Sequence, residues 1–307
     1  MPCYHLNHAW LPKSGKGRPH FQYNPQYSGE WIQLPCGQCI GCRIDKSRAW
    51  AVRCMHEAQT IEEDHGPGKS KFVTLTYAPE HLPKNGSLQL RQLQKFLKRY
   101  RKSTDHEIRY FACGEYGANL SRPHYHLILF NADLGETKQI GRTKQGHALH
   151  SSQKIERSWP YGYNWTGEVT FQSAAYVARY IMKKVNGAEA NTHYNDLDKK
   201  TGEIYSSKQP EFITMSRRPG LGKDYYDRYK SDIYPSDCCI IDNKKYPVPS
   251  YYDKLLELED PELLKELKAK RKIEADKQAK DQTTDRLRIR EQFKQKQTKL
   301  LVRELHQ

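Results

Sequence analysis

The chain has 307 residues, and its 51 Lys and Arg outnumber 36 Asp and Glu, giving a formal net charge of +15. Such an excess favours a polyanionic partner such as nucleic acid, the alternative being a basic cytosolic protein without one. No segment approaches the ~20 apolar residues of a membrane span, and MPCYHLNHAW lacks the pattern of a secretory signal. We therefore expect a cytosolic protein with no membrane contact, whose cysteines are reduced.

Up to about residue 250 the pattern predicts an α+β fold. Residues 1–42 are rich in Pro, Gly and Asn and are expected to form loops. The expected elements after them, in chain order, are a helix at 44–63, a strand at 71–79 ended by Pro79, a basic amphipathic helix at 90–102, strands at 107–115 and 124–130, and a helix at 173–185 with Ser173 as its N-cap. Two strands joined by a short turn-rich link indicate an antiparallel hairpin, so we expect a central antiparallel sheet flanked by helices.

The end of the chain has a different composition. From Leu263 onward it contains no Gly or Pro, and charges of both signs alternate with sparse apolar residues. This pattern predicts a long, solvated helix rather than a coiled-coil seam. The sequence thus divides into a cysteine-rich arm over 1–43, a central domain over 44–250 and a helical charged tail over 251–307.

The stretch RPHYHLILF, at 122–130, places His124 and His126 at alternate positions of a strand. Both imidazoles therefore share one face, and Tyr125 points to the other. Glu115 ends the preceding strand, so a hairpin would bring it beside the two imidazoles. Two nitrogens and a carboxylate can hold one divalent cation and leave positions open for a substrate. The alternative is a histidine pair bonded only to backbone and water.

A second pattern lies in YVARYIMKK, where Tyr176, Tyr180 and Lys183 follow the i, i+4, i+7 spacing of one helical stripe. Tyrosine is a poor nucleophile unless a lysine or a metal ion stabilises its phenolate. A phenolate that attacks a phosphodiester gives a phosphotyrosine ester, which conserves the bond energy for rejoining. Two tyrosines would allow two successive transfers. The alternative is that both rings only pack.

Three cysteines, Cys36, Cys39 and Cys42, have the C-x2-C-x2-C spacing of metal ligands. Tetrahedral zinc needs a fourth ligand, for which Cys3 is the nearest candidate and Cys54 or a nearby histidine the alternative. The continuation that a ferredoxin-like iron–sulfur cluster needs is missing. We therefore expect a structural zinc ion that tethers the arm, the alternative being free buried thiols.

Taken in order, KFVTLTY, PHYHLILF and YVARYIMKK resemble the three motifs of the HUH endonucleases. The further stretches CGQCIGCR, GEYG, SRRPGLG, YPSD and YYDKLL resemble the replication initiators of microviruses, in particular those of the gokushovirus branch. Microviruses are phages with small circular single-stranded DNA. The resemblance spans most of the chain from Cys3 to about Leu256, and the tail beyond carries no such motif.

The resemblance implies an HUH endonuclease domain over 44–250 that nicks one strand at a phage origin. Such an enzyme stays linked to the 5′ phosphate, leaves a 3′ hydroxyl as primer and later rejoins a unit-length circle. The metal ligands of the motif fall on His124 and His126, with Glu115 as the expected third ligand for Mg²⁺ or Mn²⁺. The nucleophile pair falls on Tyr176 and Tyr180.

The remaining expectations concern the nucleophile and the DNA. Lys183 falls where the motif places a lysine beside the nucleophile. Thr76 and Tyr77 end the first-motif strand and are expected to contact DNA. The basic helix at 90–102, together with Arg217 and Arg218, is a candidate for backbone phosphate contacts, the alternative being a solvated charged face. Single-stranded and origin DNA are the expected partners, a host replication helicase is a further candidate, and the host cytoplasm is the expected location.

Two other interpretations stay open. One is a plasmid initiator, relaxase or transposase of the same HUH type, which differs in its DNA substrate. The other is a non-enzymatic DNA- or RNA-binding protein with a zinc arm, whose activity would survive loss of the tyrosines or histidines.

Overall fold

The computed structural model describes residues 3–300 except 16, 118–119, 143–145, 147, 180–183, 186–188 and 198–203. The described chain divides into two compact units. The smaller unit combines the N-terminal residues up to Lys46 with the residues from Glu262 onward, and the larger unit is formed by Ser47–Pro261.

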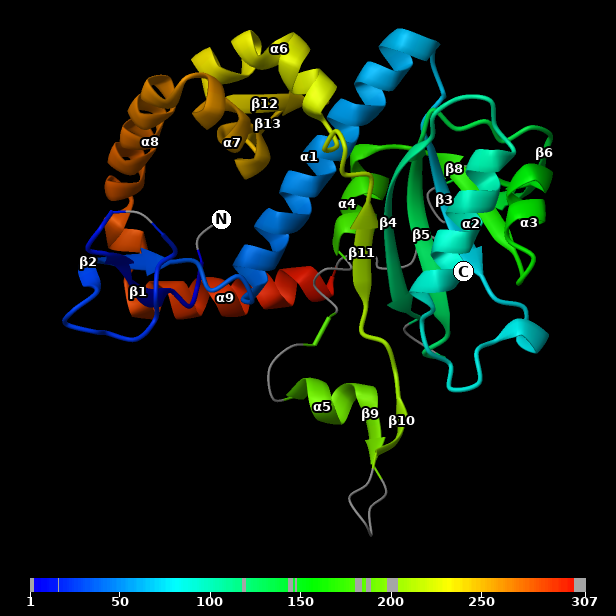
Figure 1. Cartoon of the computed structure of the whole chain (residues 1–307), viewed down its shortest axis with the longest axis horizontal. Coiled ribbons are helices and arrows are strands. Elements are labelled where there is room, and N and C mark those ends of the chain that lie inside the picture. Colours follow the sequence, from blue (N-terminus) through cyan, green and yellow to red (C-terminus); the bar gives the residue numbers. More distant parts are fainter. Residues whose placement is uncertain are drawn as a thin grey trace. The chain divides into compact units, whose positions relative to one another are not determined.

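The larger unit is built on a seven-stranded sheet with the order β11-β4-β5-β3-β8-β7-β6 (Figure 1). Its strands pair antiparallel throughout the described residues. The strands are β3 (Lys71–Thr76), β4 (Arg109–Tyr116), β5 (Pro123–Phe130), β6 (Thr137–Arg142), β7 (Ala148–Ser152), β8 (Asn164–Glu168) and β11 (Phe212–Met215). The predicted α+β fold, its antiparallel sheet and the hairpin of β4 and β5 are confirmed.

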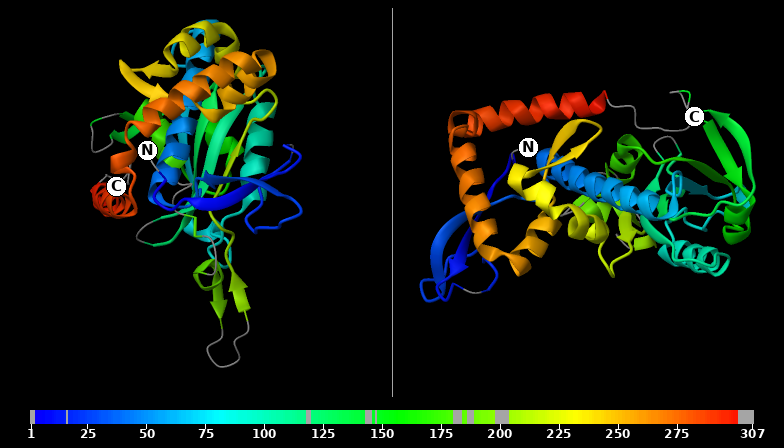
Figure 2. Two further views of the ribbon diagram at one scale, coloured as in Figure 1. Left: turned by 90° about the vertical axis from the view of Figure 1, so that its left-hand side faces the viewer. Right: turned by 90° about the horizontal axis from the view of Figure 1, so that it is seen from above.

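The two faces of this sheet pack against different helices, because successive strand residues point to opposite sides. On one face, Tyr125 and Leu127 of β5 lie in a core with α2 and α3. On the other, Ile128 and Phe130 lie in a core with α1 and α4. Figure 2 (left) shows α1 and α2 on opposite sides of the sheet. These helices are α1 (Ile40–His65), α2 (Leu90–Lys102), α3 (Gln153–Ser158) and α4 (Phe171–Arg179).

The start of α4 differs from the prediction. The Thr170 hydroxyl accepts a hydrogen bond from the Ser173 N–H at 3.1 Å, and the Ser173 hydroxyl accepts one from the Thr170 N–H at 2.8 Å. This reciprocal pair is a capping box, so Thr170 is the N-cap and Ser173 lies within the first turn. The expected N-cap at Ser173 is therefore wrong. Lys184 and Val185, which we expected to be helical, are not.

The N-terminal segment is more regular than we expected. β1 (Asn7–Pro12) and β2 (Ser28–Leu34) form an antiparallel ribbon in which Trp10 lies opposite Trp31. The prediction of loops over 1–42 is thus wrong. Abundant Pro, Gly and Asn obscured two short strands that are stabilised by pairing with each other, which the local composition does not show.

The expected long C-terminal helix is also wrong, because it is interrupted. The helices are α7 (Ser250–Glu259), α8 (Pro261–Asp276) and α9 (Thr284–Lys299). Between α8 and α9, the Asp281 carboxylate accepts from Arg286 and Arg290 at 2.8 and 2.9 Å, and Thr283 caps α9 with extended backbone. Such local polar bonds compete with a continuous helix.

The remaining described elements complete the larger unit. They are a short 3₁₀ helix at Pro79–His81, α5 (Glu189–Tyr194), β9 (Asn195–Leu197), β10 (Ile204–Ser207), α6 (Lys223–Ser236), β12 (Cys238–Ile241) and β13 (Lys244–Pro247). Among the helices of the described residues, none is both long and apolar enough to cross a membrane.

Candidate active site

Glu115, His124 and His126 come together on the face of the sheet that packs against α1 and α4. Glu115 of β4 lies directly opposite His124 of β5 in the strand register. Oε1 of Glu115 lies 2.6 Å from Nε2 of His124 and 2.9 Å from Nε2 of His126. The three potential ligand atoms lie within 4.8 Å of one another. The sheet thus brings together the three side chains that the sequence singled out.

Burial and neighbouring charge determine the protonation state of the Glu115 carboxyl group. Glu115 is 1% exposed and His126 is 2% exposed. Burial alone would raise the pKa of Glu115, but hydrogen bonds from His124 and His126 and their positive charge outweigh it and hold the pKa well below its usual value. Glu115 is therefore ionised at neutral pH, which is the form that binds a cation.

The Nδ1 atoms of both imidazoles, which face away from Glu115, are hydrogen-bonded to neighbouring groups. Nδ1 of His124 lies 3.1 Å from the Arg122 carbonyl oxygen, and Nδ1 of His126 lies 2.9 Å from the Thr74 hydroxyl. A carbonyl only accepts, so Nδ1 of His124 carries the proton and donates it. Its Nε2 is then left to hold either a second proton or a metal ion. Metal-binding histidines are commonly oriented by such bonds to the other ring nitrogen.

Tyr176 of α4 lies beside this cluster. Its ring centroid is 5.2 Å from that of His126, with the two planes at 83°. The guanidinium of Arg179 lies 5.8 Å from the same ring, and Tyr176 itself is 7% exposed. Tyr180 and Lys183 lie outside the described residues, so the structure places only the first member of the predicted stripe.

The four predicted cysteine ligands gather in the smaller unit. The sulfur atoms of Cys3, Cys36, Cys39 and Cys42 lie within 4.8 Å of one another, and none is in a disulfide. Backbone N–H groups donate to three of them: Cys36 N–H to Cys3 Sγ at 3.2 Å, Cys39 N–H to Cys36 Sγ at 3.2 Å, and Tyr4 N–H to Cys39 Sγ at 3.3 Å.

At Cys36 the backbone donors favour a thiolate. Burial opposes ionisation of Cys36, but the N–H groups of Cys39 and Gln38 outweigh it and lower the pKa of Cys36 to about 7. Cys54, the alternative fourth ligand, instead lies in the apolar core between α1 and the sheet of the larger unit. Cys3 is thus the cysteine that joins the other three.

The residues expected to contact DNA have different surroundings. Thr76 is half-buried and lies opposite His124 in the register, so it borders the cluster. Arg217 and Arg218 are exposed just beyond β11. Tyr77, however, is 2% exposed, and its hydroxyl bonds to Tyr125, at 2.8 Å, in the core under α2. A buried ring is not available to a DNA strand, so the expectation for Tyr77 is corrected.

Sequence reasoning missed the residues that orient the site. Thr74 holds His126, the Arg122 carbonyl holds His124, and Arg179 lies over Tyr176. Thr74 had a signal, because it alternates with Thr76 in KFVTLT and so shares the face of the sheet that borders His124.

The histidine pair and the described part of the tyrosine helix lie within the segment that matches a protein family. The model of the family "Replication-associated protein ORF2/G2P" matches residues 70–185. The chain is 33% identical over 240 residues to the "Replication-associated protein ORF2" of Spiroplasma virus 4, covering 74% of this chain and 68% of that protein. It is 31% identical over 259 residues to the "Replication-associated protein VP4" of Bdellovibrio phage phiMH2K, covering 81% and 76% of the two chains.

A third relative, the "Replication-associated protein ORF4" of Chlamydia phage 1, is 30% identical over 232 residues, covering 73% of this chain and 53% of that protein. No solved structure matches the chain. The sequence comparisons thus define a phage-type replication-associated protein. The chain belongs to the family of replication-associated proteins that these phage proteins represent, which confirms the resemblance seen in the sequence.

Proposed function

We propose that this protein is an HUH-type replication initiator that nicks the origin of a circular phage DNA, forms a 5′-phosphotyrosine link and rejoins the strands. The observation that carries the proposal is the position of Tyr176, whose ring centroid lies 5.2 Å from that of His126 beside the Glu115–His124–His126 cluster. A tyrosine nucleophile and a cation site side by side are what strand transfer through a phosphotyrosine needs.

Glu115, His124 and His126 would hold the cation, for which Mg²⁺ or Mn²⁺ is proposed. The fit rests on one ionised carboxylate and two imidazoles whose Nε2 atoms converge on it, with both Nδ1 atoms already bonded elsewhere. Among the described residues the cluster supplies three ligands, so positions stay open for a phosphate oxygen or water. When bound, the ion would polarise the scissile phosphate and stabilise charge on the leaving oxygen.

The hydroxyl oxygen of Tyr176 attacks the scissile phosphorus. A Tyr O–P bond forms and the P–O3′ bond breaks, while the tyrosine proton is lost and the leaving O3′ gains one to become the free 3′-hydroxyl primer. The Arg179 guanidinium, 5.8 Å from the Tyr176 ring, favours the phenolate electrostatically. Rejoining is the reverse transfer. On sequence evidence, Tyr180 supplies the second nucleophile and Lys183 its neighbouring cation.

A structural zinc ion is proposed for Cys3, Cys36, Cys39 and Cys42. Four sulfur ligands close a tetrahedral site and leave no open position, which is typical of structural rather than catalytic zinc. Leu287 of α9 is buried against the same cluster, so the ion would hold the arm and part of the tail together within the smaller unit.

In this proposal residues 44–250 are the endonuclease domain, with 1–43 and 251–307 as its arm and tail. Thr76, Arg217 and Arg218 contact single-stranded and origin DNA, a host replication helicase is a candidate partner, and the protein acts in the cytoplasm of a bacterial host. The phage relatives favour this role over that of a plasmid initiator, relaxase or transposase.

The test is a covalent-adduct assay. Labelled single-stranded fragments of the phage genome are incubated with the protein and Mn²⁺, and label that migrates with the protein in denaturing electrophoresis is measured. We expect an adduct that is lost in His124→Ala and in the double variant Tyr176→Phe/Tyr180→Phe. Tyr163→Phe, which changes a tyrosine that is 59% exposed, is the control that keeps it. Binding without any adduct would refute the proposal and favour a non-enzymatic nucleic-acid-binding protein.

A further inference from the structure

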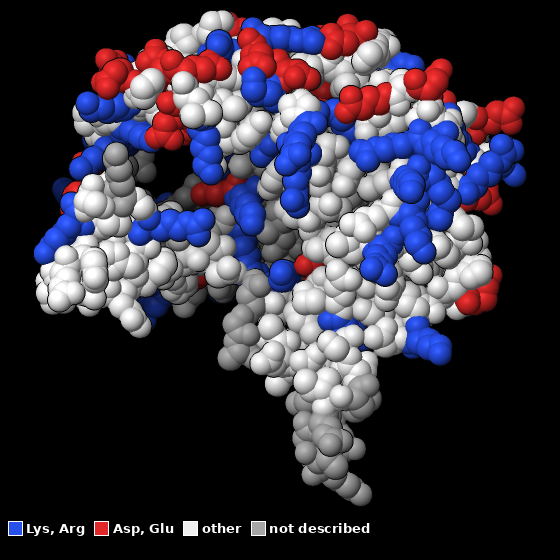
Figure 3. Space-filling model, viewed as in Figure 1, with Lys and Arg blue, Asp and Glu red and all other residues white. Residues whose placement is uncertain are grey.

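A strongly basic surface covers the outer side of α2. This helix carries six cations and no acidic residue, and among the described residues none of the six forms an ion pair with a carboxylate. The six are Arg91, Lys95, Lys98, Arg99, Arg101 and Lys102. Figure 3 shows Lys and Arg side chains gathered over this part of the larger unit. Within the described part of the chain, no carboxylate therefore offsets the charge of these residues.

Four of these cations form a straight row. Arg91, Lys95, Lys98 and Lys102 are spaced at i, i+4, i+7 and i+11, which places them on one side of the helix, and all four are exposed. At 1.5 Å of rise per residue the row is about 16 Å long. The opposite side of α2 is held in the core by its buried residues Leu93, Phe96, Leu97 and Tyr100. The row cannot turn inward without exposing that side.

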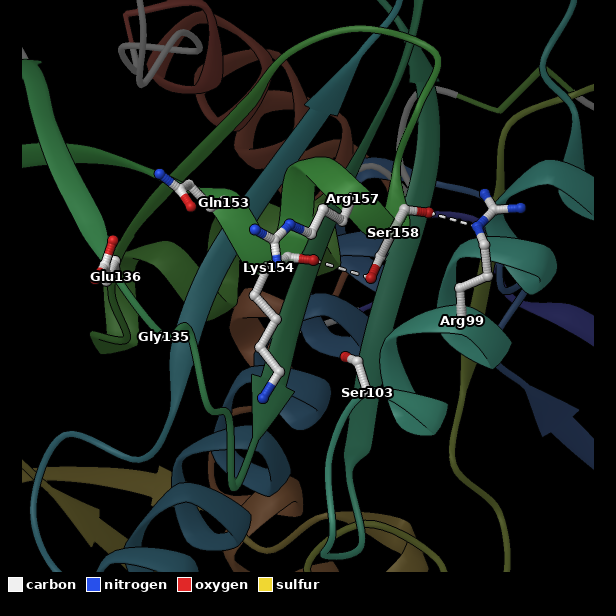
Figure 4. Close-up of a pocket in the computed structure, with 8 residues that line it drawn as sticks. All are labelled: Arg99, Ser103, Gly135, Glu136, Gln153, Lys154, Arg157 and Ser158. Carbon is white, nitrogen blue, oxygen red and sulfur yellow. Dashed lines mark hydrogen bonds between the residues drawn. The ribbon is translucent and has the colours of Figure 1, made fainter.

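The row continues onto α3. Arg99, Lys154 and Arg157 line a cavity of about 540 Å³ between the two helices, together with Ser103 and the acidic Glu136 (Figure 4). Lys154 is also ion-paired with Asp133. The Arg99 guanidinium donates from Nε to the Ser158 carbonyl at 2.8 Å and so ties α2 to α3. We call the four-residue row and this cavity the α2–α3 basic surface. The helix backbone sets the spacing of the four-residue row, which suits a regular array of phosphates.

This surface lies on the side of the sheet away from the candidate active site. α2 packs on the face to which Tyr125 points, whereas His126 points to the opposite face and Tyr176. DNA bound to α2 and a strand bound at Tyr176 would therefore occupy separate sites.

Among the described residues, neither α2 nor α3 presents an exposed aromatic ring, and the partly buried Tyr161 beside them lies against Arg99. Sites for single-stranded DNA combine cations with exposed aromatic rings. The aromatic residues of α2, Phe96 and Tyr100, are fully buried, and none of the exposed large apolar side chains of the described residues lies on α2 or α3. We infer that the α2–α3 basic surface binds the sugar–phosphate backbone of duplex DNA, on the side of the sheet opposite the proposed nicking site.

The test compares two variants that each remove four positive charges. The first changes Arg91, Lys95, Lys98 and Lys102 to Gln. The matched control changes four exposed lysines elsewhere, Lys244, Lys245, Lys270 and Lys272, to Gln. Binding of a short labelled duplex is measured by fluorescence anisotropy between about 50 and 200 mM salt. Each phosphate contact contributes about 0.9 to the slope of log affinity against log salt, so the first variant should lose up to about 3.6 while the control keeps the wild-type slope.

Two further measurements distinguish a loss of duplex binding from misfolding and from a failure of the proposed nicking activity. The paired variant Lys95→Gln/Lys98→Gln should lose up to about 1.8 of the slope, half of the full effect. Both variants should bind a short single strand as the wild type does, which shows an intact fold without relying on cleavage. Equal slopes in the variant and the control, or a larger loss with the single strand than with the duplex, would overturn the inference.

Discussion

Thr74→Val should weaken cation binding although Thr74 itself supplies no ligand atom. Its hydroxyl lies 2.9 Å from Nδ1 of His126, and the residue is 1% exposed. Valine keeps the volume and the β-branched shape but removes that bond. His126 then loses the partner that fixes the rotation of its ring, and its Nε2 is less firmly aimed at Glu115.

The expected size follows from this contact. Loss of an orienting bond of this kind typically lowers metal affinity by about 10- to 100-fold. The same change should lower the free energy of unfolding by about 1 kcal/mol, because one buried hydrogen bond is lost and no cavity is created. The two effects are separable, since the first requires a metal ion and the second does not.

The matched control is Thr166→Val. Thr166 lies on β8 of the same sheet, is 2% exposed and donates to the His150 carbonyl at 3.1 Å. It should lose similar stability but keep its Mn²⁺ affinity. Isothermal titration with Mn²⁺, alongside urea unfolding, measures both quantities in both variants. Equal Mn²⁺ affinity in wild type and Thr74→Val, or an equal loss in Thr166→Val, would refute the reasoning.

Three further predictions concern zinc, pH and DNA. Cys36→Ser should lose the bound zinc, measured by elemental analysis, and its smaller unit should become more sensitive to protease. Cys238→Ser, which lies outside the cluster, should keep the wild-type zinc content and protease resistance. Full zinc content in Cys36→Ser would contradict the proposed zinc site. Burial lowers the pKa of His56 to about 3, below its value near 6.5 in the unfolded chain. The stability that the neutral imidazole contributes is therefore present above pH 6.5 and is lost as the pH falls toward 3. The loss in the free energy of unfolding is up to about 1.4 kcal/mol per pH unit. Urea unfolding from pH 7 to 4 should therefore show a shallower pH dependence in His56→Gln, and an identical dependence would count against the buried neutral imidazole. Tyr77→Phe should lower the free energy of unfolding by about 1–2 kcal/mol, because the lost hydroxyl bonds to both Tyr125 and Gln92. DNA affinity in an anisotropy titration should stay unchanged, and weaker DNA binding by the folded variant would support a direct contact of Tyr77 with DNA.

Local pattern was sufficient for much of the site. Alternation along β5 already separates His124 and His126 from Tyr125, because the period of a strand is a property of consecutive residues. A short turn-rich link between two strands was enough to bring Glu115 toward His124, and the structure has them directly opposite. The amphipathic spacing of α2 likewise predicted its bounds, Leu90–Lys102.

Only the tertiary structure decided features that depend on which distant elements meet. Tyr77 follows directly after the first-motif strand, yet it is buried, because Tyr125 and the core under α2 enclose its ring. Cys3 joins the other three cysteines through the fold of the N-terminal arm, whose two strands lie far enough apart in the sequence that their pairing is a non-local contact. The break before α9 contains no Gly or Pro, and what the structure shows there is Asp281 paired with Arg286 and Arg290. Neighbouring residues determine the periodicity of a helix or strand, and therefore the face to which each side chain points. The burial of a side chain and its bonding partners depend instead on contacts between residues far apart in the sequence, which no local pattern contains.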